Sequence, residues 1–181
     1  MTKMLDLSGG FIMYRKLSVL LSIFVITLAV LMVPFEGQTE PQEVVNDAVY
    51  YTQKGVSNFQ EAFYELMPMG KREEALQRYR QAVTEFKRAI AINESYVEAH
   101  RNLARVYYVQ NNFTEAAEQY KRITELAPSD IDAYLNLASS YERMNRYSEA
   151  VEHLEKAKTL SSEAMVIDKI NGLIVKLQKE N

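Results

Sequence analysis

Arginine and asparagine side chains at helical spacing are the residues of this chain best suited to recognise another molecule. An asparagine can pair with a peptide backbone through one donor and one acceptor, and an arginine fork can hold a carboxylate. Four-residue spacing puts two such side chains on one helical face, and a repeat period puts others at equivalent places further along. The residues of this kind that could contact a partner are Arg101, Asn102, Arg105, Asn136 and Arg143.

Catalytic chemistry has little support in the sequence. The chain has two histidines, His100 and His153, and no cysteine. Neither histidine belongs to an i, i+4 pair of the kind that holds a metal ion, and no glycine-rich phosphate loop occurs. Both histidines are most simply interpreted as packing residues. We therefore expect no catalytic residue, no cofactor and no metal site, and an enzyme is the least favoured interpretation.

The sequence elements that must position these polar residues repeat along the chain with a period of about 34 residues. This period is typical of stacked helix–turn–helix units. Each such unit is too small to bury its own apolar face. The small residues lie where two helices approach closely, and tyrosine and leucine fill the space around them. The recurring pairs are Ala99 and Ala133, Asn102 and Asn136, Leu103 and Leu137, Ala104 and Ala138, Tyr107 and Tyr141, Glu115 and Glu149, and Ala116 and Ala150.

This pattern resembles the tetratricopeptide repeat (TPR) family, in which aromatic, leucine, small and proline residues stand at fixed spacings. The matching residues are Leu103, Ala104, Tyr107, Ala116, Tyr120 and Pro128 in one unit, and Tyr134, Leu137, Ala138, Tyr141, Ala150 and Ala157 in the next. The departures are His100, Ile123, Leu154 and Ser162. The resemblance implies that the first helices of the units line a groove for an extended peptide or a partner helix. The predicted residues of this peptide-binding groove are Arg101, Asn102, Arg105, Asn136 and Arg143.

Some members of this family hold a partner's terminal carboxylate with a clamp of basic residues and asparagine. Arg101, Arg105 and Asn136 match that clamp in part. Val166 and Ile170 occupy the face where a third helix would add basic residues, so the clamp is incomplete.

An earlier unit with longer helices is predicted over residues 45–96. Tyr79, Ala82 and Phe86 stand one repeat period before Phe113, Ala116 and Tyr120. The matching first helix lies upstream of a Pro-containing turn, and its small residue is Gly55. The separation of Gly55 from Ala82 is more than twice that of the equivalent pair in the next unit, and the excess adds roughly two helical turns to each arm. The projecting tip offers Met67, Pro68 and Met69 as a second contact surface.

The predicted fold is therefore all-α: a right-handed helical-hairpin solenoid of about three units with an elongated first unit. The regular units cover residues 97–130 and 131–162, and a C-terminal capping helix covers 163–181. A partner-binding amphipathic helix is the alternative for that last segment. An N-terminal transmembrane helix is predicted ahead of the array.

Residues 17–33 form an uncharged apolar run long enough for a short membrane span. We interpret residues 17–35 as a signal-anchor helix. A cleaved signal peptide is the alternative, although no small–x–small cleavage site follows the run. Met13 begins a shorter basic segment ahead of the apolar run than Met1 does, so either methionine can be the true first residue of the protein. Residues 36–44 are polar and are predicted to form a linker.

Charge predicts the orientation of this anchor. Residues 1–16 hold Lys3, Arg15 and Lys16 against Asp6, whereas residues 34–47 are acidic with no lysine or arginine. Positive flanks stay in the cytoplasm, so residues 1–16 are expected there and the repeats outside, in the periplasm of a bacterium with two membranes. Beyond residue 16 the chain holds 18 basic and 23 acidic side chains, dispersed along its length. Nucleic acid is therefore not an expected partner.

Together these features predict a membrane-tethered adaptor that binds a protein or peptide and helps to assemble a complex of the cell envelope. The alternative is a structural scaffold in which the repeats self-associate on the membrane as a homo-oligomer.

Overall fold

The computed structural model describes residues 41–180, which fold into seven α-helices and one π-helical segment without a strand among them. The first hairpin is formed by α2 (Pro41–Gln60), which continues into the π-helix η1 (Glu61–Leu66), and α3 (Arg72–Ile92). The next two hairpins are α4 (Val97–Val109) with α5 (Phe113–Leu126), and α6 (Ile131–Arg143) with α7 (Tyr147–Leu160). The last helix is α8 (Ala164–Glu180).

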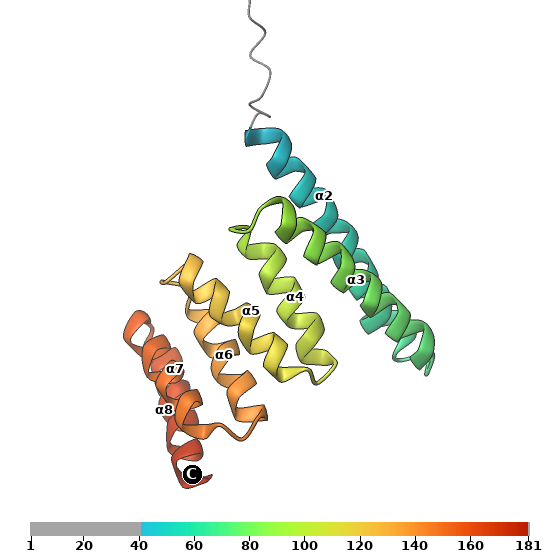
Figure 1. The fold of residues 1–181 in the computed structure, drawn as a ribbon. Coiled ribbons are helices and arrows are strands. Elements are labelled where there is room, and N and C mark those ends of the chain that lie inside the picture. The colour runs from blue at the N-terminus through green and yellow to red at the C-terminus, as the bar shows by residue number, and fades with distance from the viewer. Residues whose placement is uncertain (1–40, 181) are drawn as a thin grey trace, which may run out of the picture. The chain divides into compact units, whose positions relative to one another are not determined.

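Each helix of this array packs against the next one along the chain, and α2 also contacts α4. Figure 1 shows the order, from α2 and α3 on the right to α7 and α8 on the left. This arrangement is the TPR-type solenoid that the repeat period predicts, because each hairpin completes its apolar core only with its neighbour.

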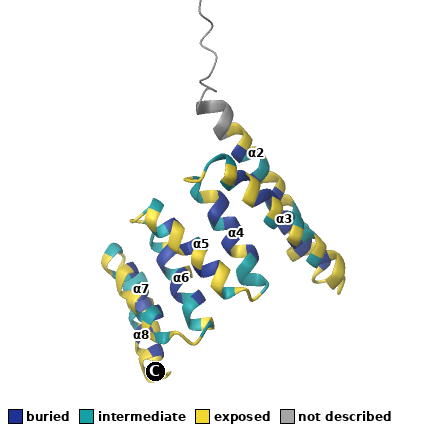
Figure 2. Ribbon diagram, in the orientation of Figure 1, coloured by how far each residue is buried: buried dark blue, intermediate teal, exposed yellow. Residues whose placement is uncertain are grey.

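The core follows the sequence period closely. Ala82, Ala116 and Ala150, each one period from the next, are all fully buried, and so are Ala89, Ile123 and Ala157. Figure 2 shows buried residues along the facing sides of the helices and exposed residues at the turn of the first hairpin. Alanine at five of these six positions allows the paired helices to approach closely, and tyrosine and leucine side chains fill the remaining space.

The closest approach involving a glycine is between α2 and α3. A Cβ atom placed on Gly55 would lie 2.6 Å from the ring of Phe86, which is itself fully buried. Gly55, the predicted small residue of the first unit, therefore lies inside a helix at a position where the absence of a side chain leaves space for the Phe86 ring.

Replacing Gly55 by Ala is expected to lower the free energy of unfolding by about 1–2 kcal/mol, even though alanine favours a helix by about 1 kcal/mol over glycine. Overpacking costs about 1–3 kcal/mol, and the Phe86 ring that would have to move is fully buried. The matched control is Gly172→Ala in α8, where a Cβ atom would meet nothing within 4 Å. That change should raise stability in urea denaturation, and equal effects of the two changes would contradict the packing.

Two turns repeat with the same period. Asn111 after α4 and Asn145 after α6 have φ angles of 62° and 59°, the left-handed conformation that asparagine tolerates well. In each turn a backbone N–H reaches back to a tyrosine carbonyl, from Asn112 to Tyr107 and from Arg146 to Tyr141. Both bonds are 2.9 Å long and close the first helix of the unit.

The first hairpin is longer than the others, and its turn lies at residues 67–71. The first helix begins at Pro41, earlier than the expected residue 45, so the end of the predicted linker 36–44 belongs to α2. The predicted cytoplasmic segment 1–16 and anchor 17–35 lie outside the described residues. Among residues 41–180 no helix is long and apolar enough to cross a membrane.

The last helix covers the end of the array. Ile170, Ile174 and Leu177 of α8 are buried against a cluster that includes Leu154 and Ala157 of α7. Other faces of α8 carry Asp168, Lys169 and Lys179, which are exposed. The helix thus packs on one side as a capping helix does.

Candidate functional site

A pocket lies between α2 and α4, the first helices of the first two units. We call it the groove pocket. Its volume is about 320 Å³, and side chains of α2 form most of its wall. The residues that line it are Val49, Thr52, Gln53, Val56, Ser57, Gln60, Tyr96, Glu98 and Asn102.

The polar groups of the groove pocket are not all satisfied within the described chain. Thr52 is 4% exposed, and its buried hydroxyl has no hydrogen-bond partner among residues 41–180. Asn102 is also buried, and its Nδ2 donates to the backbone oxygen of Glu98 at 2.9 Å and to Glu98 Oε1 at 2.8 Å. The amide of Asn102 is therefore held in place by α4, with its nitrogen turned toward Glu98.

Arg101 differs from its expected role as a free groove residue. Its guanidinium donates to Asp130 Oδ2, and it also lies 3.7 Å from Glu98 Oε2. The other carboxylate oxygen of Asp130 accepts from the backbone N–H of Ala133 at 2.9 Å and caps α6. Arg101 thus joins the second unit to the start of the third, and periodicity alone could not show this partner.

Arg105 is exposed, and it lies over an aromatic ring. Its guanidinium carbon is 5.5 Å from the centre of the Phe59 ring, a cation–π contact between α4 and α2. Burial raises the pKa of the nearby Tyr120 hydroxyl to about 12, and the charges of Arg105 and Arg101 oppose that rise. Both arginines therefore lie near the same buried tyrosine, as their four-residue spacing predicts.

Asn136 and Arg143 do not line the groove pocket. The side chain of Asn136 donates to the carbonyl of Asp132 in its own helix at 2.8 Å and is exposed. Arg143 lies over the Phe113 ring at 4.9 Å and lines a separate pocket with Glu142 and Lys176. Of the five predicted groove residues, only Asn102 lines the groove pocket. The other four lie in different surroundings.

The hairpin tip forms a second pocket that sequence reasoning located only in part. Met67 and Pro68 line it, whereas Met69 is 70% exposed beside it. The aromatic residues Phe63 and Tyr64 also line it, and they were not predicted. The sequence signal that could have indicated Phe63 and Tyr64 was their position in the elongated arm of the first hairpin, where no regular unit supplies a helix to cover them.

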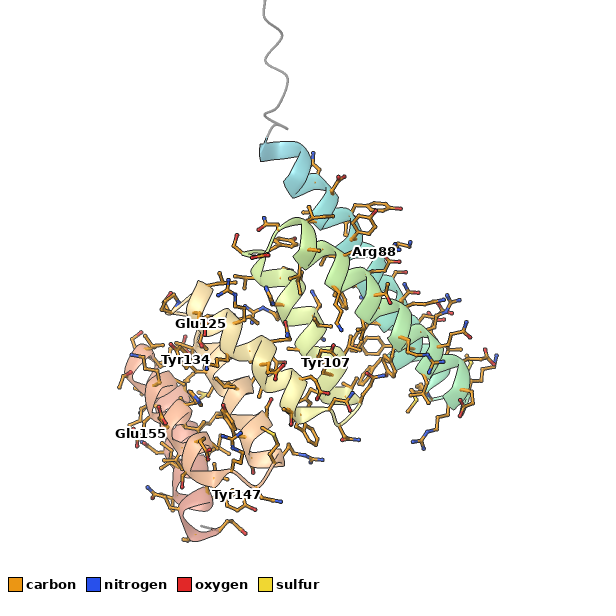
Figure 3. All side chains as sticks on the ribbon, in the orientation of Figure 1. Arg88, Tyr107, Glu125, Tyr134, Tyr147 and Glu155 are labelled. Atoms are coloured by element: carbon orange, nitrogen blue, oxygen red, sulfur yellow. The ribbon has the colours of Figure 1, made fainter. Side chains whose placement is uncertain are left out.

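The two histidines pack between helices. His100 Nδ1 lies 2.9 Å from Gln119 Oε1, and Nε2 lies 3.1 Å from the carbonyl oxygen of Glu94. His153 stacks on Tyr141, with ring centres 5.4 Å apart, and faces Tyr134 at 6.3 Å. Figure 3 shows Tyr134 beside the helix that carries Glu155. Both Tyr134 and Glu155 line a pocket with His153.

Stability should fall as the pH is lowered through the usual histidine range, because burial lowers the pKa of His153 in the folded chain. The carboxylates of Glu152 and Glu149 oppose this shift, and the charge of Lys121 adds to it. The unfolded chain, with an ordinary pKa of about 6.5, therefore takes up the proton more readily. The contribution is present above that pKa and is lost as the pH falls through the folded value.

Urea denaturation between about pH 8 and pH 5 measures this dependence, which covers the range of histidine titration. The variant His153→Gln should show a flatter profile, while the carboxylates common to both proteins cancel in the comparison. A profile unchanged by that substitution would contradict the assignment to His153.

A row of helical hairpins with a polar pocket between successive first helices defines a repeat protein of the protein-interaction class. Two tetratricopeptide repeat profiles match the chain, one over residues 67–131 and the other over residues 110–159. The chain therefore belongs to the tetratricopeptide repeat family across residues 67–159. Comparison with curated protein sequences gives no match.

Solved structures with the same fold include three TPR domains. The Arabidopsis OM64 TPR domain is 17% identical, with a TM-score of 0.59 over 76% of this chain and 99% of that one. The TPR2B domain of yeast Sti1, in a complex with pHsp70, is 19% identical, with a TM-score of 0.56 over 75% and 99%. The second TPR of Spaghetti (RPAP3), bound to the HSP90 peptide SRMEEVD, is 18% identical, with a TM-score of 0.54 over 66% and 97%. At these identities the likeness is one of fold.

Proposed function

We propose that this chain is a membrane-tethered adaptor that binds an extended segment of a partner protein in the groove pocket and recruits it to a complex of the cell envelope. The observation that carries the proposal is the buried, unpartnered hydroxyl of Thr52 in the wall of that pocket. An unsatisfied buried hydroxyl costs free energy, and a polar group of a bound segment would remove that cost once the Thr52 side chain rotates its hydroxyl toward the pocket.

The chemistry of the pocket favours recognition of a peptide backbone. Amide and hydroxyl groups of Thr52, Gln53, Ser57 and Gln60 line it, and these groups both donate and accept hydrogen bonds. Its lining contains a single charged residue, Glu98. A neutral or basic extended segment fits this lining better than an acidic terminus does, in contrast to the acidic HSP90 peptide on the Spaghetti domain.

Site-specific photocross-linking in the native membrane tests the groove. A photoreactive residue at Gln53 of the full chain should capture a partner, and the same residue at the exposed position Thr84 on α3 should not. Thr52→Val should lower that capture at least tenfold, about 1.4 kcal/mol, while leaving the array folded or slightly more stable. The matched control Thr84→Val should leave capture unchanged. Equal capture from positions 53 and 84 would contradict a groove site.

The membrane tether rests on the apolar run at residues 17–33 and the charges that flank it. A reporter enzyme that works only outside the cytoplasm, fused after Asn181, should be active. Replacing Arg15 and Lys16 by Glu should weaken or invert the orientation. A cytoplasm-only reporter that is active on the unaltered chain would reject this topology.

Self-association into a membrane scaffold is the second candidate. It is favoured by the apolar side chains Met165, Leu173 and Val175, which α8 exposes at the end of the array. Sedimentation of the full chain at several concentrations separates the two functions, since an adaptor stays monomeric and a scaffold grows with concentration.

A further inference from the structure

The elongated first hairpin and the end of α4 enclose a second pocket, which we call the tip pocket. Its volume is about 610 Å³, within the range of about 300–1,000 Å³ that compact ligands occupy. Five of its ten lining residues are Phe63 and Tyr64 of η1, Leu76 and Tyr79 of α3, and Val109 of α4. Because the hairpin is longer than α4, Phe63 and Tyr64 extend beyond the cover that α4 gives, whereas Tyr79 is buried.

The aromatic residues of the tip pocket are held in a fixed arrangement. Phe63 stacks on Phe59 with ring centres 5.6 Å apart, and Tyr64 meets Phe63 edge-on at 5.0 Å. Phe59 in turn contacts Tyr79 at 5.9 Å. Even so, Phe63 and Tyr64 remain 40% and 62% exposed. An ordered aromatic surface with this exposure is suited to receive an apolar side chain with little loss of conformational entropy.

The backbone at this place is also unusual. Phe63 and Tyr64 belong to a short π-helix, Glu61–Leu66, within an otherwise α-helical arm. Short π-helical segments are rare and occur frequently at functional sites. Here the segment determines how the two rings are presented to the pocket.

The tip pocket contains one charged lining residue, Arg72, and its guanidinium has no ion pair or hydrogen bond within the described chain. Two neighbouring basic residues are already paired: Lys71 lies 3.3 Å from Glu74, and Arg78 lies 2.9 Å from Glu61. Glu65 and Glu73 are exposed in the same part of the hairpin. An unpaired arginine beside an apolar wall is complementary to a carboxylate that follows an apolar side chain.

We propose that the tip pocket is a second docking site, distinct from the groove pocket, which binds a partner segment carrying bulky apolar side chains followed by acidic residues. The apolar side chains insert against Phe63, Tyr64 and Leu76, and the carboxylate pairs with Arg72. The groove pocket, whose lining charge is negative, binds a different kind of segment. The chain thereby holds two segments at once, from one partner or from two.

Methionine methyl NMR of the full chain tests this site, because Met67 lines the pocket and Met165 lies in α8 at the other end of the array. The probes are blocked nonapeptides of glycine and serine with a central Leu-Phe pair. Two Glu follow this pair in one set, two Gln in the second and two Lys in the third. The Glu set should shift the Met67 methyl signal, with a Kd at least tenfold lower than that of the Gln set, and the Lys set should bind most weakly.

Variants of the full chain separate the contributions. Arg72→Gln should remove the preference for Glu over Gln, whereas Arg80→Gln, an exposed arginine of the same helix outside the pocket, should keep it. Tyr64→Ser should weaken binding of all three sets. Thr52→Val should have no effect, which distinguishes this site from the groove pocket.

Three results would overturn the proposal. The first is equal affinity for the Glu and Gln sets in the unaltered chain. The second is a Met67 signal that no peptide moves at millimolar concentration. The third is a Met67 signal that depends on protein concentration without any peptide, which would make a second copy of the chain the occupant.

Discussion

Replacing Phe86 by Ala is expected to lower the free energy of unfolding by about 3–5 kcal/mol, the usual cost of removing a buried aromatic ring. Phe86 is fully buried in a cluster that joins the first hairpin to Leu103 and Val106 of α4. Its ring fills the space that Gly55 leaves on α2, and glycine has no side chain that could fill the resulting cavity. Urea denaturation followed by circular dichroism measures the loss.

A matched control for this change is Phe63→Ala in the same hairpin, because Phe63 is well exposed. It should cost less than half as much, since the loss is mainly that of its ring contacts with Phe59 and Tyr64 at an exposed position. The coupling between Phe86 and Gly55 gives a second check. In a Phe86→Leu background, Gly55→Ala should cost less than in the unaltered chain, because the ring that it would strike is gone. Additive effects would show that the two residues do not touch.

Asp130→Ala should be the other strongly destabilising change, by about 2–4 kcal/mol. It removes the cap on α6, worth about 0.5–2 kcal/mol, and the hydrogen bond from Arg101, a charged contact worth about 1.5–3 kcal/mol. Both partners of the ion pair are largely shielded from solvent, so salt should screen it only weakly. Thermal and urea unfolding measure the loss.

Two further variants divide this effect. Asp130→Asn keeps an oxygen that can cap Ala133 and loses the charge, and Arg101→Gln keeps the cap and loses the ion pair. Each should cost about half as much as Asp130→Ala. If Asp130→Asn proved as damaging as Asp130→Ala, the cap would contribute nothing and the ion pair would carry the whole effect.

The repeat period was enough to predict the regular part of the array. Small residues such as Ala116 and Ala150 can be assigned to helix contacts because a larger side chain would not fit there, and both are fully buried. The elongated unit was also predictable, because the spacing from Gly55 to Ala82 exceeds that from Ala104 to Ala116 by roughly a whole number of helical turns. These features depend on the spacing of residues that are close in the chain, and that spacing can be read from the sequence.

The environment of the polar residues could not be obtained in this way. Periodicity places Arg101 on the inner face of α4, but its pairing with Asp130 depends on how the next unit is stacked. The burial of Asn102 likewise depends on stacking, since α2 contacts α4. The tip pocket depends on the overhang of η1 and α3 past Val109, a feature of three helices together.

The uninterrupted passage from α2 into η1 has a mechanical consequence. Gln60, where α2 and η1 meet, keeps a right-handed helical backbone, so the segment from Pro41 to Leu66 forms one continuous helical rod. At about 1.5 Å per residue it is roughly 39 Å long. Because α3 packs against it, this segment keeps the hairpin tip at a constant distance from residue 41. A flexible tether would allow that distance to vary. A force applied to a partner at the tip would therefore displace or tilt the whole helical segment, including its first residue, instead of being absorbed by bending within it.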